Sequence, residues 1–133
     1  ALSNAMYRTL AEALEEAEKD PSIRAVLFEG EGGFFPAGND LSDFAAVAMG
    51  GQAPQEVGRF LRALAAAQKP LVASVVGLAV GIGVTLLLHC DLVYVASDAT
   101  LPTPFVTLDL VPEAASSILL AARIGSARSV DAV

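Results

Sequence analysis

The sequence has few of the residues on which several classes of protein depend. Only one of its 133 residues is a cysteine, so a scaffold held together by internal disulfides is excluded. Cys90 has neither a CxxC partner nor a histidine cluster near it, which disfavours a zinc site. Basic residues are scarce too, with 8 Lys and Arg against 15 Asp and Glu and a formal net charge of −7. Because nucleic-acid binding needs a basic face, this balance argues against that function.

The chain is also poor in charge as a whole. Charged residues make up 17% of it and hydrophobic residues 54%, which excludes an intrinsically disordered chain. The length corresponds to one domain, residues 1–133, with no internal repeat or linker to divide it. No basic stretch followed by an apolar one opens the sequence, so we expect a cytoplasmic protein. Helical patterns at both ends lead us to expect an internal piece of a longer chain.

The hydrophobic pattern predicts alternating helices and strands. A first helix follows a candidate N-cap at Ser3 and stops at Asp20-Pro21, because proline disfavours helix in the residue before it. Its apolar stripe comprises Met6, Leu10, Leu14 and Ala17. Short apolar runs predict buried strands at 25–28, 71–76 and 91–96. Further helices are predicted at 40–49, from Pro54 to Lys69-Pro70, from 84–88 and at 113–124. This order predicts an α/β fold.

Residues 70–90 carry no formal charge at neutral pH, which raises the alternative of a membrane-spanning helix. Gly77 and Gly81 also have the small-xxx-small spacing found where transmembrane helices pack. However, the run opens with β-branched residues, and Gly77, Gly81 and Gly83 interrupt it where a turn needs backbone freedom. A strand, a glycine turn and a helix in an α/β core explain the segment better.

Three segments carry the residue types of a functional site. Residues 34–41 form a glycine-containing loop before a predicted helix, whose free N–H groups can bind an oxyanion; a plain connection explains the loop equally well. Residues 76–84 repeat this arrangement around Ile82, and N–H groups from two such loops could form an oxyanion hole. The spacing fits neither a dinucleotide-binding fingerprint nor a P-loop. In residues 104–117, Glu113 is either a first-turn carboxylate favoured by the helix dipole or a general base.

Taken together, these segments resemble the crotonase, or enoyl-CoA hydratase/isomerase, superfamily. The matching pieces are Asp20-Pro21-Ser22-Ile23-Arg24-Ala25-Val26, Ala37-Gly38-Asn39-Asp40-Leu41, Lys69-Pro70, Gly81-Ile82-Gly83 and Cys90-Asp91. The resemblance implies an α/β, crotonase-type spiral of ββα units that binds an acyl-CoA, here lacking the first strand and the C-terminal helical region. It also implies that the backbone N–H groups of Asn39 and Ile82 polarise the thioester carbonyl, with the CoA adenine near residues 37–41.

Other positions of the family's motifs distinguish the reactions that its members catalyse. Hydratases of the family use two glutamates, at positions held here by Thr85 and Phe105, so the resemblance argues against ordinary hydratase activity. Glu113 after Pro112 is instead similar to the Pro-Glu segment of the Δ3,Δ2-enoyl-CoA isomerase branch. That branch moves the double bond of a 3-enoyl-CoA to the 2-trans position, and Glu113 would carry the proton. Asp109 departs from the pattern, since the family usually has glycine there.

The remaining assignments also follow from the resemblance or from the local sequence. The substrate-binding candidates are Ala37, Asp40, Leu41, Phe105 and Leu108, the last two forming an apolar wall that would raise the pKa of Glu113. We expect structural roles for His89, Cys90, Ser116 and Ser117, and for Asp40 and Asp43 the first turn of a helix. Candidates for binding the CoA phosphates are Arg24, Arg59, Arg62 and Lys69.

The resemblance implies no metal, no cofactor beyond the CoA of the substrate, and neither a nucleic-acid nor a membrane partner. It also implies a homotrimer or hexamer in the full-length protein. Three alternatives stay open: a hydratase that uses other residues, an acyl-CoA thioesterase, and a non-catalytic acyl-CoA-binding protein.

Overall fold

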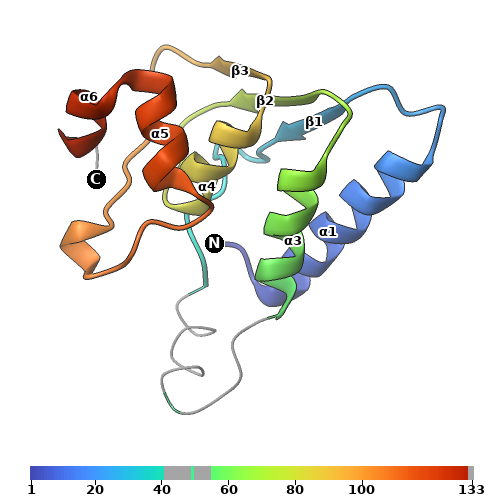
Figure 1. Ribbon diagram of the computed structural model, residues 1–133, viewed down its shortest axis with the longest axis horizontal. Helices are drawn as coiled ribbons and strands as arrows, with labels where there is room; N and C mark the ends of the chain where they lie inside the picture. The colour runs from blue at the N-terminus through green and yellow to red at the C-terminus, as the bar shows by residue number, and fades with distance from the viewer. Residues whose placement is uncertain (41–48, 50–54, 132–133) are drawn as a thin grey trace.

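The structure is a computed structural model that describes residues 1–40, 49 and 55–131. Its centre is a parallel sheet in the order β1-β2-β3 (Figure 1). The strands are β1 (Val26–Glu29), β2 (Leu71–Val75) and β3 (Leu92–Val95). The helices are α1 (Asn4–Lys19), α3 (Gln55–Ala66), α4 (Ile82–Thr85), α5 (Ser116–Ile124) and α6 (Ser126–Asp131). Short 3₁₀ turns cover Leu86–His89 and Val106–Leu108. This arrangement confirms the predicted α/β class.

Helix α1 begins where the sequence predicts and buries Leu14 and Ala17 as expected, but its first two turns bury Tyr7 and Ala11 in place of Met6 and Leu10. The side chain of Ser3 caps it by accepting a hydrogen bond from the Met6 N–H at 3.3 Å. Met6, predicted to be buried, is 47% exposed, whereas Tyr7 is 1% exposed. The reason is the position of α3, which packs along α1 and places the Phe60 ring 5.6 Å from the Tyr7 ring. The buried residues of α1 are Tyr7, Ala11, Leu14 and Ala17.

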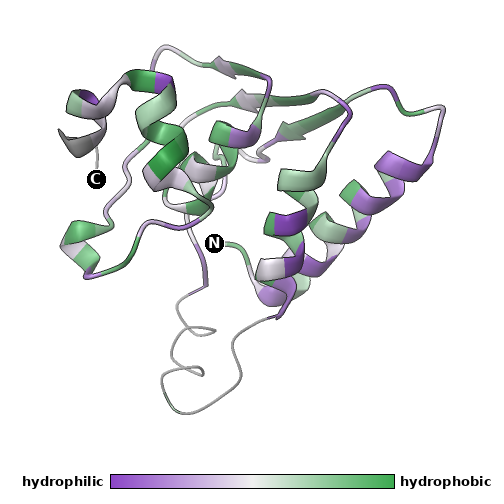
Figure 2. Cartoon of the chain, viewed as in Figure 1, coloured by the Kyte–Doolittle hydropathy of each residue, from purple (hydrophilic) through white to green (hydrophobic). Residues whose placement is uncertain are grey.

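The central strand and its neighbouring helix agree with the pattern. Strand β2 alternates between buried and half-buried residues, with Leu71, Ala73 and Val75 facing the core. Helix α3 turns Phe60 and Leu64 inward. In Figure 2 the strands are mostly hydrophobic, and α1 alternates between hydrophilic and hydrophobic positions along its length. The predicted helix at 40–49, including Asp43, and the predicted start at Pro54 lie outside the described residues, apart from positions 40 and 49.

Strand β3 forms as predicted, but the expectation that it is buried is wrong. All four of its residues are exposed, and Tyr94 reaches 65%. It is an edge strand, paired only with β2, and α5 packs against the Leu86–His89 turn. The apolar sequence therefore reflects β-propensity but not burial within the described residues.

The uncharged run at residues 70–90 folds as a strand, a turn and short helical segments. It contains β2, the glycine turn after it, α4 and the Leu86–His89 turn, which confirms the interpretation preferred above. No helix within the described part of the chain has both the length and the apolar character needed to span a membrane.

The segment before α5 differs from the prediction. Helix α5 starts at Ser116 and not at Glu113, so Glu113 lies in an irregular stretch three residues ahead of it. Ala114 and Ala115 adopt positive φ angles of 54° and 56°, which a helix cannot accommodate. The helix ends at Gly125 with φ 85°, as predicted for a glycine after a helix C-terminus. The first-turn explanation of Glu113 is therefore wrong.

Candidate active site

The segments that follow the three strands pair with one another in the same order as the strands. Parallel bridges link Leu2 to Asn39, Ala37 to Val80 and Leu78 to Thr100. The Leu2 N–H donates to the Gly38 carbonyl at 2.8 Å, and the Asp40 N–H donates to the Leu2 carbonyl at 3.0 Å. In a parallel bridge of this kind the N–H of the intervening residue points away from its partner. The Asn39 N–H is therefore held facing away from Leu2.

Glycines let the two loops after β1 and β2 approach closely. A Cβ atom on Gly83 would lie 1.8 Å from the Pro36 carbonyl oxygen, and one on Gly77 would lie 2.2 Å from the Gly33 oxygen. Gly81 has φ 56° and ψ −118°, a conformation open essentially to glycine alone. A Cβ built on Gly81 would lie 3.6 Å from the Gly38 Cα. The backbones of the loops are thus in direct contact.

A cavity of about 620 Å³ opens where these loops meet the segment before α5. Its lining comprises Ala1, Ala37, Gly38, Asn39, Asp40, Val80, Gly81, Ile82, Pro104, Phe105, Leu108, Leu110, Val111 and Glu113. The predicted catalytic, oxyanion-hole and substrate-binding residues are all in this set except Leu41, which lies outside the described residues, whereas none of the four basic candidates for the CoA phosphates lines the cavity. The structure therefore brings together residues from three distant segments of the chain.

Two residues that line this cavity have backbone N–H groups without an acceptor in the described part of the chain. Ile82 is the first residue of α4, so its N–H has no partner inside the helix. Among the described residues, no backbone or side-chain oxygen accepts a hydrogen bond from the N–H of Asn39 or of Ile82. Ile82 is buried and Asn39 is half-buried. Because buried backbone donors are almost always paired, the N–H of Ile82 in particular is a feature that a ligand oxygen in the cavity would complete.

Glu113 supplies a carboxylate to the same cavity. Its Oε1 lies 3.8 Å from the position of a Cβ on Gly81, and its Oε2 lies 3.5 Å from the Asn39 Nδ2, which donates to it. Burial raises the pKa of Glu113, and the hydrogen bond from Asn39 partly opposes that rise. The sequence predicted this direction. Of the two wall residues, Phe105 is 5% exposed and Leu108 is 57% exposed, so within the described residues only Phe105 shields the site.

The positions of the family's two hydratase glutamates differ in their surroundings. Phe105 lines the cavity, whereas Thr85 does not; it is 1% exposed, and no described residue bonds its hydroxyl. Asp40 is the second acidic residue in the described lining. Asp109, which replaces a family glycine, takes a left-handed conformation with φ 54°. Aspartate tolerates that conformation better than most residues other than glycine.

Of the residues that we expected to be structural, His89, Cys90 and Ser116 are held within the fold, whereas the expected packing of Ser117 is wrong because that residue is exposed. His89 Nε2 lies 2.9 Å from the Ala114 carbonyl oxygen, which links the Leu86–His89 turn to the segment carrying Glu113. Cys90 is 2% exposed, and burial raises the pKa of its thiol to about 11, so it stays protonated. Ser116 is buried at the start of α5, and Ser117 is exposed.

Two of the four basic candidates for the CoA phosphates are engaged elsewhere. Arg59 binds Glu15 through two nitrogens, at 2.8 and 2.7 Å, and lies near Glu12 and Glu56. Lys69 donates to the carbonyls of Ala17 and Asp20 at the end of α1. These contacts join α1 to α3 and to β2, so both residues serve the fold.

Sequence reasoning missed Tyr7 and the apolar residues Leu110 and Val111. The Tyr7 hydroxyl donates to the Asn39 Oδ1. Its burial could have been found only by placing α3, because the helical spacing alone favours the stripe through Met6. Leu110 and Val111 are exposed residues of the cavity lining, and no local pattern distinguishes them.

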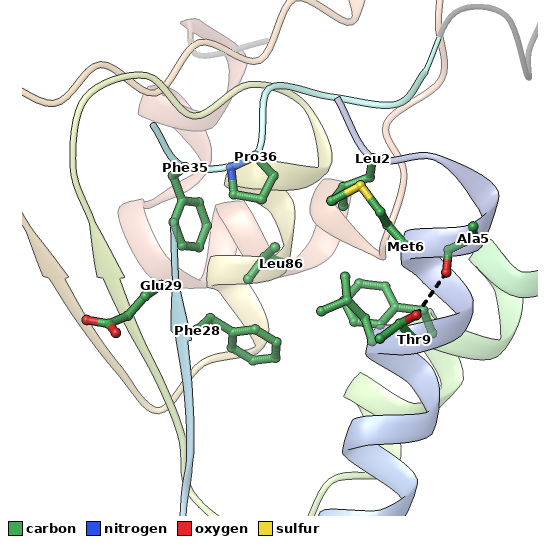
Figure 3. Close-up of a pocket in the computed structure, with 11 residues that line it drawn as sticks. Leu2, Ala5, Met6, Thr9, Phe28, Glu29, Phe35, Pro36 and Leu86 are labelled. Atoms are coloured by element: carbon green, nitrogen blue, oxygen red, sulfur yellow. Dashed lines mark hydrogen bonds between the residues drawn. The ribbon is translucent and has the colours of Figure 1, made fainter. Parts of the chain in front are cut away.

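A second cavity, of about 370 Å³, lies between α1 and β1 (Figure 3). Its lining is almost wholly apolar: Leu2, Ala5, Met6, Thr9, Leu10, Phe28, Glu29, Phe35, Pro36, Phe60 and Leu86. The Thr9 hydroxyl donates within its own helix, to the Ala5 carbonyl at 3.2 Å. Glu29 is the one acidic residue in the described lining of this cavity, and it is exposed, whereas the larger cavity holds the half-buried Glu113 beside two loop N–H groups, so we place the candidate active site in the larger one.

The parallel sheet and the second ladder formed by the segments that follow it superimpose on solved enoyl-CoA hydratase/isomerase structures, so the protein has the crotonase fold. The profile of the family described as Enoyl-CoA hydratase/isomerase matches residues 1–133. The chain belongs to this family.

Relatives of both reaction types are similar to the chain. It is 38% identical to enoyl-CoA delta isomerase 2 of Rattus norvegicus over 98% of its own length and 34% of that protein. It is 36% identical to 2,3-dehydroadipyl-CoA hydratase of Escherichia coli, over 94% of the chain and 49% of that protein. A solved structure, a putative enoyl-CoA hydratase/carnithine racemase from Magnetospirillum magneticum, superimposes with a TM-score of 0.90 at 45% identity, covering 100% of this chain and 52% of that one. The chain thus spans about a third to a half of the length of these proteins.

Proposed function

We propose that the protein is an isomerase that moves the double bond of a 3-enoyl-CoA to the 2-trans position. The observation that carries the proposal is the place of Glu113: a half-buried carboxylate with a raised pKa, in the cavity that two unpaired N–H groups also border. A base of raised pKa, an apolar surround and an oxyanion site are what proton abstraction next to a thioester requires.

The reaction follows from these three features. The C2 proton of a 3-enoyl thioester lies between the carbonyl and the double bond. Glu113 takes this proton, the C–H electrons form a dienolate, and its charge resides mostly on the thioester oxygen. The N–H groups of Asn39 and Ile82 donate to that oxygen; in well-studied oxyanion holes one such donor is worth roughly 10²- to 10³-fold in rate. Protonated Glu113 then returns the proton at C4, so one carboxylate suffices.

The same cavity supports the choice of acyl-CoA as substrate class. Its lining near Glu113 is largely apolar, with Phe105, Leu108 and Leu110 on one side, which suits a fatty acyl chain. The adenine would lie near residues 37–41, of which residues 37–40 line the cavity. No cofactor and no metal enters the scheme. A homotrimer or hexamer in the cytoplasm belongs to this proposal, and light scattering of the full-length protein checks the assembly.

Replacing Glu113 by glutamine tests the proposal. Glutamine keeps the shape of the side chain and can still accept a bond from Asn39, but it cannot take a proton. We expect Glu113→Gln to lower kcat for 3-enoyl-CoA by roughly 10²- to 10⁴-fold, with acyl-CoA affinity changed by only a few fold. Turnover close to that of the unsubstituted protein would refute the assignment.

A hydratase is the second candidate, because Asp40 places another carboxylate in the cavity and one of the similar proteins is named as a hydratase. It would form a 3-hydroxyacyl-CoA from 2-trans-enoyl-CoA and would lose that activity in both Glu113→Gln and Asp40→Asn. Incubation with saturated acyl-CoA tests the thioesterase alternative by release of free CoA. Binding without any turnover would identify a non-catalytic protein.

A further inference from the structure

We propose that Tyr7 is a positioning residue that fixes the side chain of Asn39 and, through it, the carboxylate of Glu113. The inference rests on the proposed function in one respect, the role of Glu113 as the base. Tyr7 lies at the start of α1, outside the lining of the cavity, and it touches no reacting atom.

A chain of hydrogen bonds joins the three residues. The Tyr7 hydroxyl donates to the Asn39 Oδ1, and the Asn39 Nδ2 donates to the Glu113 Oε2 at 3.5 Å. The two ends of the carboxamide thus have different partners, one a donor and the other an acceptor. A carboxamide that turns over by 180° exchanges its oxygen and nitrogen at little steric cost. Such a turn would direct Oδ1 at the Glu113 carboxylate, which repels it.

Tyr7 disfavours that turn because its hydroxyl stays protonated and offers a hydrogen to Oδ1. Burial raises the pKa of Tyr7, and the negative charge of nearby Glu113 raises it further. The ring itself is fixed: Tyr7 is 1% exposed and lies 5.6 Å from the ring of Phe60. The donor therefore reaches Asn39 from a rigid part of the core.

The same end of the chain also holds the backbone of Asn39. Leu2 pairs with Gly38 and Asp40 on either side of Asn39, which aims the Asn39 N–H away from Leu2. Five residues later, Tyr7 holds the Asn39 side chain. One residue, Asn39, is thereby fixed at its backbone for the oxyanion and at its carboxamide for the base. The start of α1 couples the two halves of the site.

The substitution Tyr7→Phe isolates this role because it removes only the hydroxyl and keeps the ring against Phe60. Without a fixed donor on Oδ1, the Asn39 Nδ2 stabilises the ionised Glu113 less, so the pKa of Glu113 rises. We expect the acid limb of the kcat/KM profile to move up by roughly 0.5–1 pH unit and kcat to fall roughly 3- to 10-fold, with KM little changed. Tyr94→Phe is the matched control, because Tyr94 is 65% exposed on β3. It should leave all three quantities unchanged.

A double-mutant cycle shows whether Tyr7 acts through Asn39. Asn39→Ala removes the carboxamide and keeps the backbone N–H, so it should shift the acid limb by itself, and Tyr7→Phe should add nothing in that background. An acid limb and kcat that stay unchanged in Tyr7→Phe would overturn the proposal. So would a Tyr7→Phe effect of equal size with and without the Asn39 side chain, because that result indicates packing alone.

A titration without substrate separates this proposal from the proposed function. The carbon resonance of the Glu113 carboxyl, followed by NMR in the ligand-free full-length protein, should titrate at higher pH in Tyr7→Phe than in the unsubstituted protein and in Tyr94→Phe. If the protein does not isomerise 3-enoyl-CoA, the proposed function fails while this titration still tests the network. An identical Glu113 titration in all three proteins would overturn the role of Tyr7 whatever the activity.

Discussion

Two regions meet at the candidate site, and they are built differently. The glycine loops, residues 30–39 and 76–83, press backbone against backbone, so that a methyl group on Gly83 would lie 1.8 Å from another residue's carbonyl oxygen. The base segment, residues 104–115, is loosely covered: Val106 is 67% exposed and Val111 is 86% exposed. It also holds three residues other than glycine at positive φ.

The two regions supply different parts of the proposed chemistry. Main-chain N–H groups in the glycine loops present the proposed oxyanion site whatever side chains surround them, so that part can stay constant while reactions change. The base segment contributes Glu113, the proposed base, whereas the other acidic residue of the described lining, Asp40, comes from the end of the first loop. The family's naming after both isomerases and hydratases is consistent with a constant oxyanion site and a variable base.

The largest expected effect tests the tightness of the glycine loops. In Gly83→Ala the new methyl group meets the Pro36 backbone, which cannot move without displacing the loop. We expect the free energy of unfolding to fall by about 3 kcal/mol or more, measured by urea denaturation. Gly58→Ala is the control: in α3 its methyl would meet only the flexible end of Arg62, at 3.3 Å. It should stabilise the protein by about 0.5–1 kcal/mol. Equal stability of Gly83→Ala and the unsubstituted protein would contradict this account of the loops.

Within the base segment, Phe105 and Leu108 should behave differently although both line the cavity. Phe105 is 5% exposed, so Phe105→Ala should cost about 3 kcal/mol of stability and admit water beside Glu113. Water lowers the pKa of that carboxyl, so the acid limb of kcat/KM should move to lower pH. Leu108→Ala, at a residue 57% exposed, should cost less than about 1 kcal/mol. Equal costs at the two positions would show that the segment is covered more evenly than the structure indicates.

A smaller expected effect is that the free energy of unfolding depends on pH through the ionisation of Glu113. Burial raises the pKa of folded Glu113 above its ordinary value near 4.5, so the folded state binds a proton more readily than the unfolded state. Stability is therefore lost as pH rises through the raised pKa. Glu113→Gln has no such loss and should be the more stable protein at pH 7, with the difference shrinking below pH 4.5. Urea denaturation at both pH values measures it, and a difference independent of pH would contradict the raised pKa.

The sequence predicts those features of the fold and of the candidate site whose cause lies in a few neighbouring residues. Ser3 as a cap, the strand at residues 71–75 and the glycine turn before Ile82 all follow from backbone preferences. The site residues came from matching motifs, and the structure gathers them on one cavity. In each case the signal lies within a few residues of the feature it predicts.

The features that the sequence pattern did not predict share one physical cause, because each depends on segments that lie far away along the chain. Helix α1 buries Tyr7 and exposes Met6 because of where α3 lies, 50 or so residues away, as is typical where packing overrides local pattern. Strand β3 is apolar yet exposed because no described helix packs firmly on it. Nothing in the local sequence predicts the positive φ angles of Ala114 and Ala115, so the sequence pattern extends the predicted helix back to Glu113.

A crystal structure of the full-length protein with a bound 3-enoyl-CoA analogue would show directly whether Asn39, Ile82 and Glu113 contact the reacting atoms as proposed. We expect the thioester oxygen within about 2.7–3.1 Å of both the Asn39 N and the Ile82 N, and a Glu113 carboxylate oxygen within about 3.5 Å of C2. A thioester oxygen that touches neither N–H, or a Glu113 carboxylate turned away from C2 into water, would contradict the proposed mechanism.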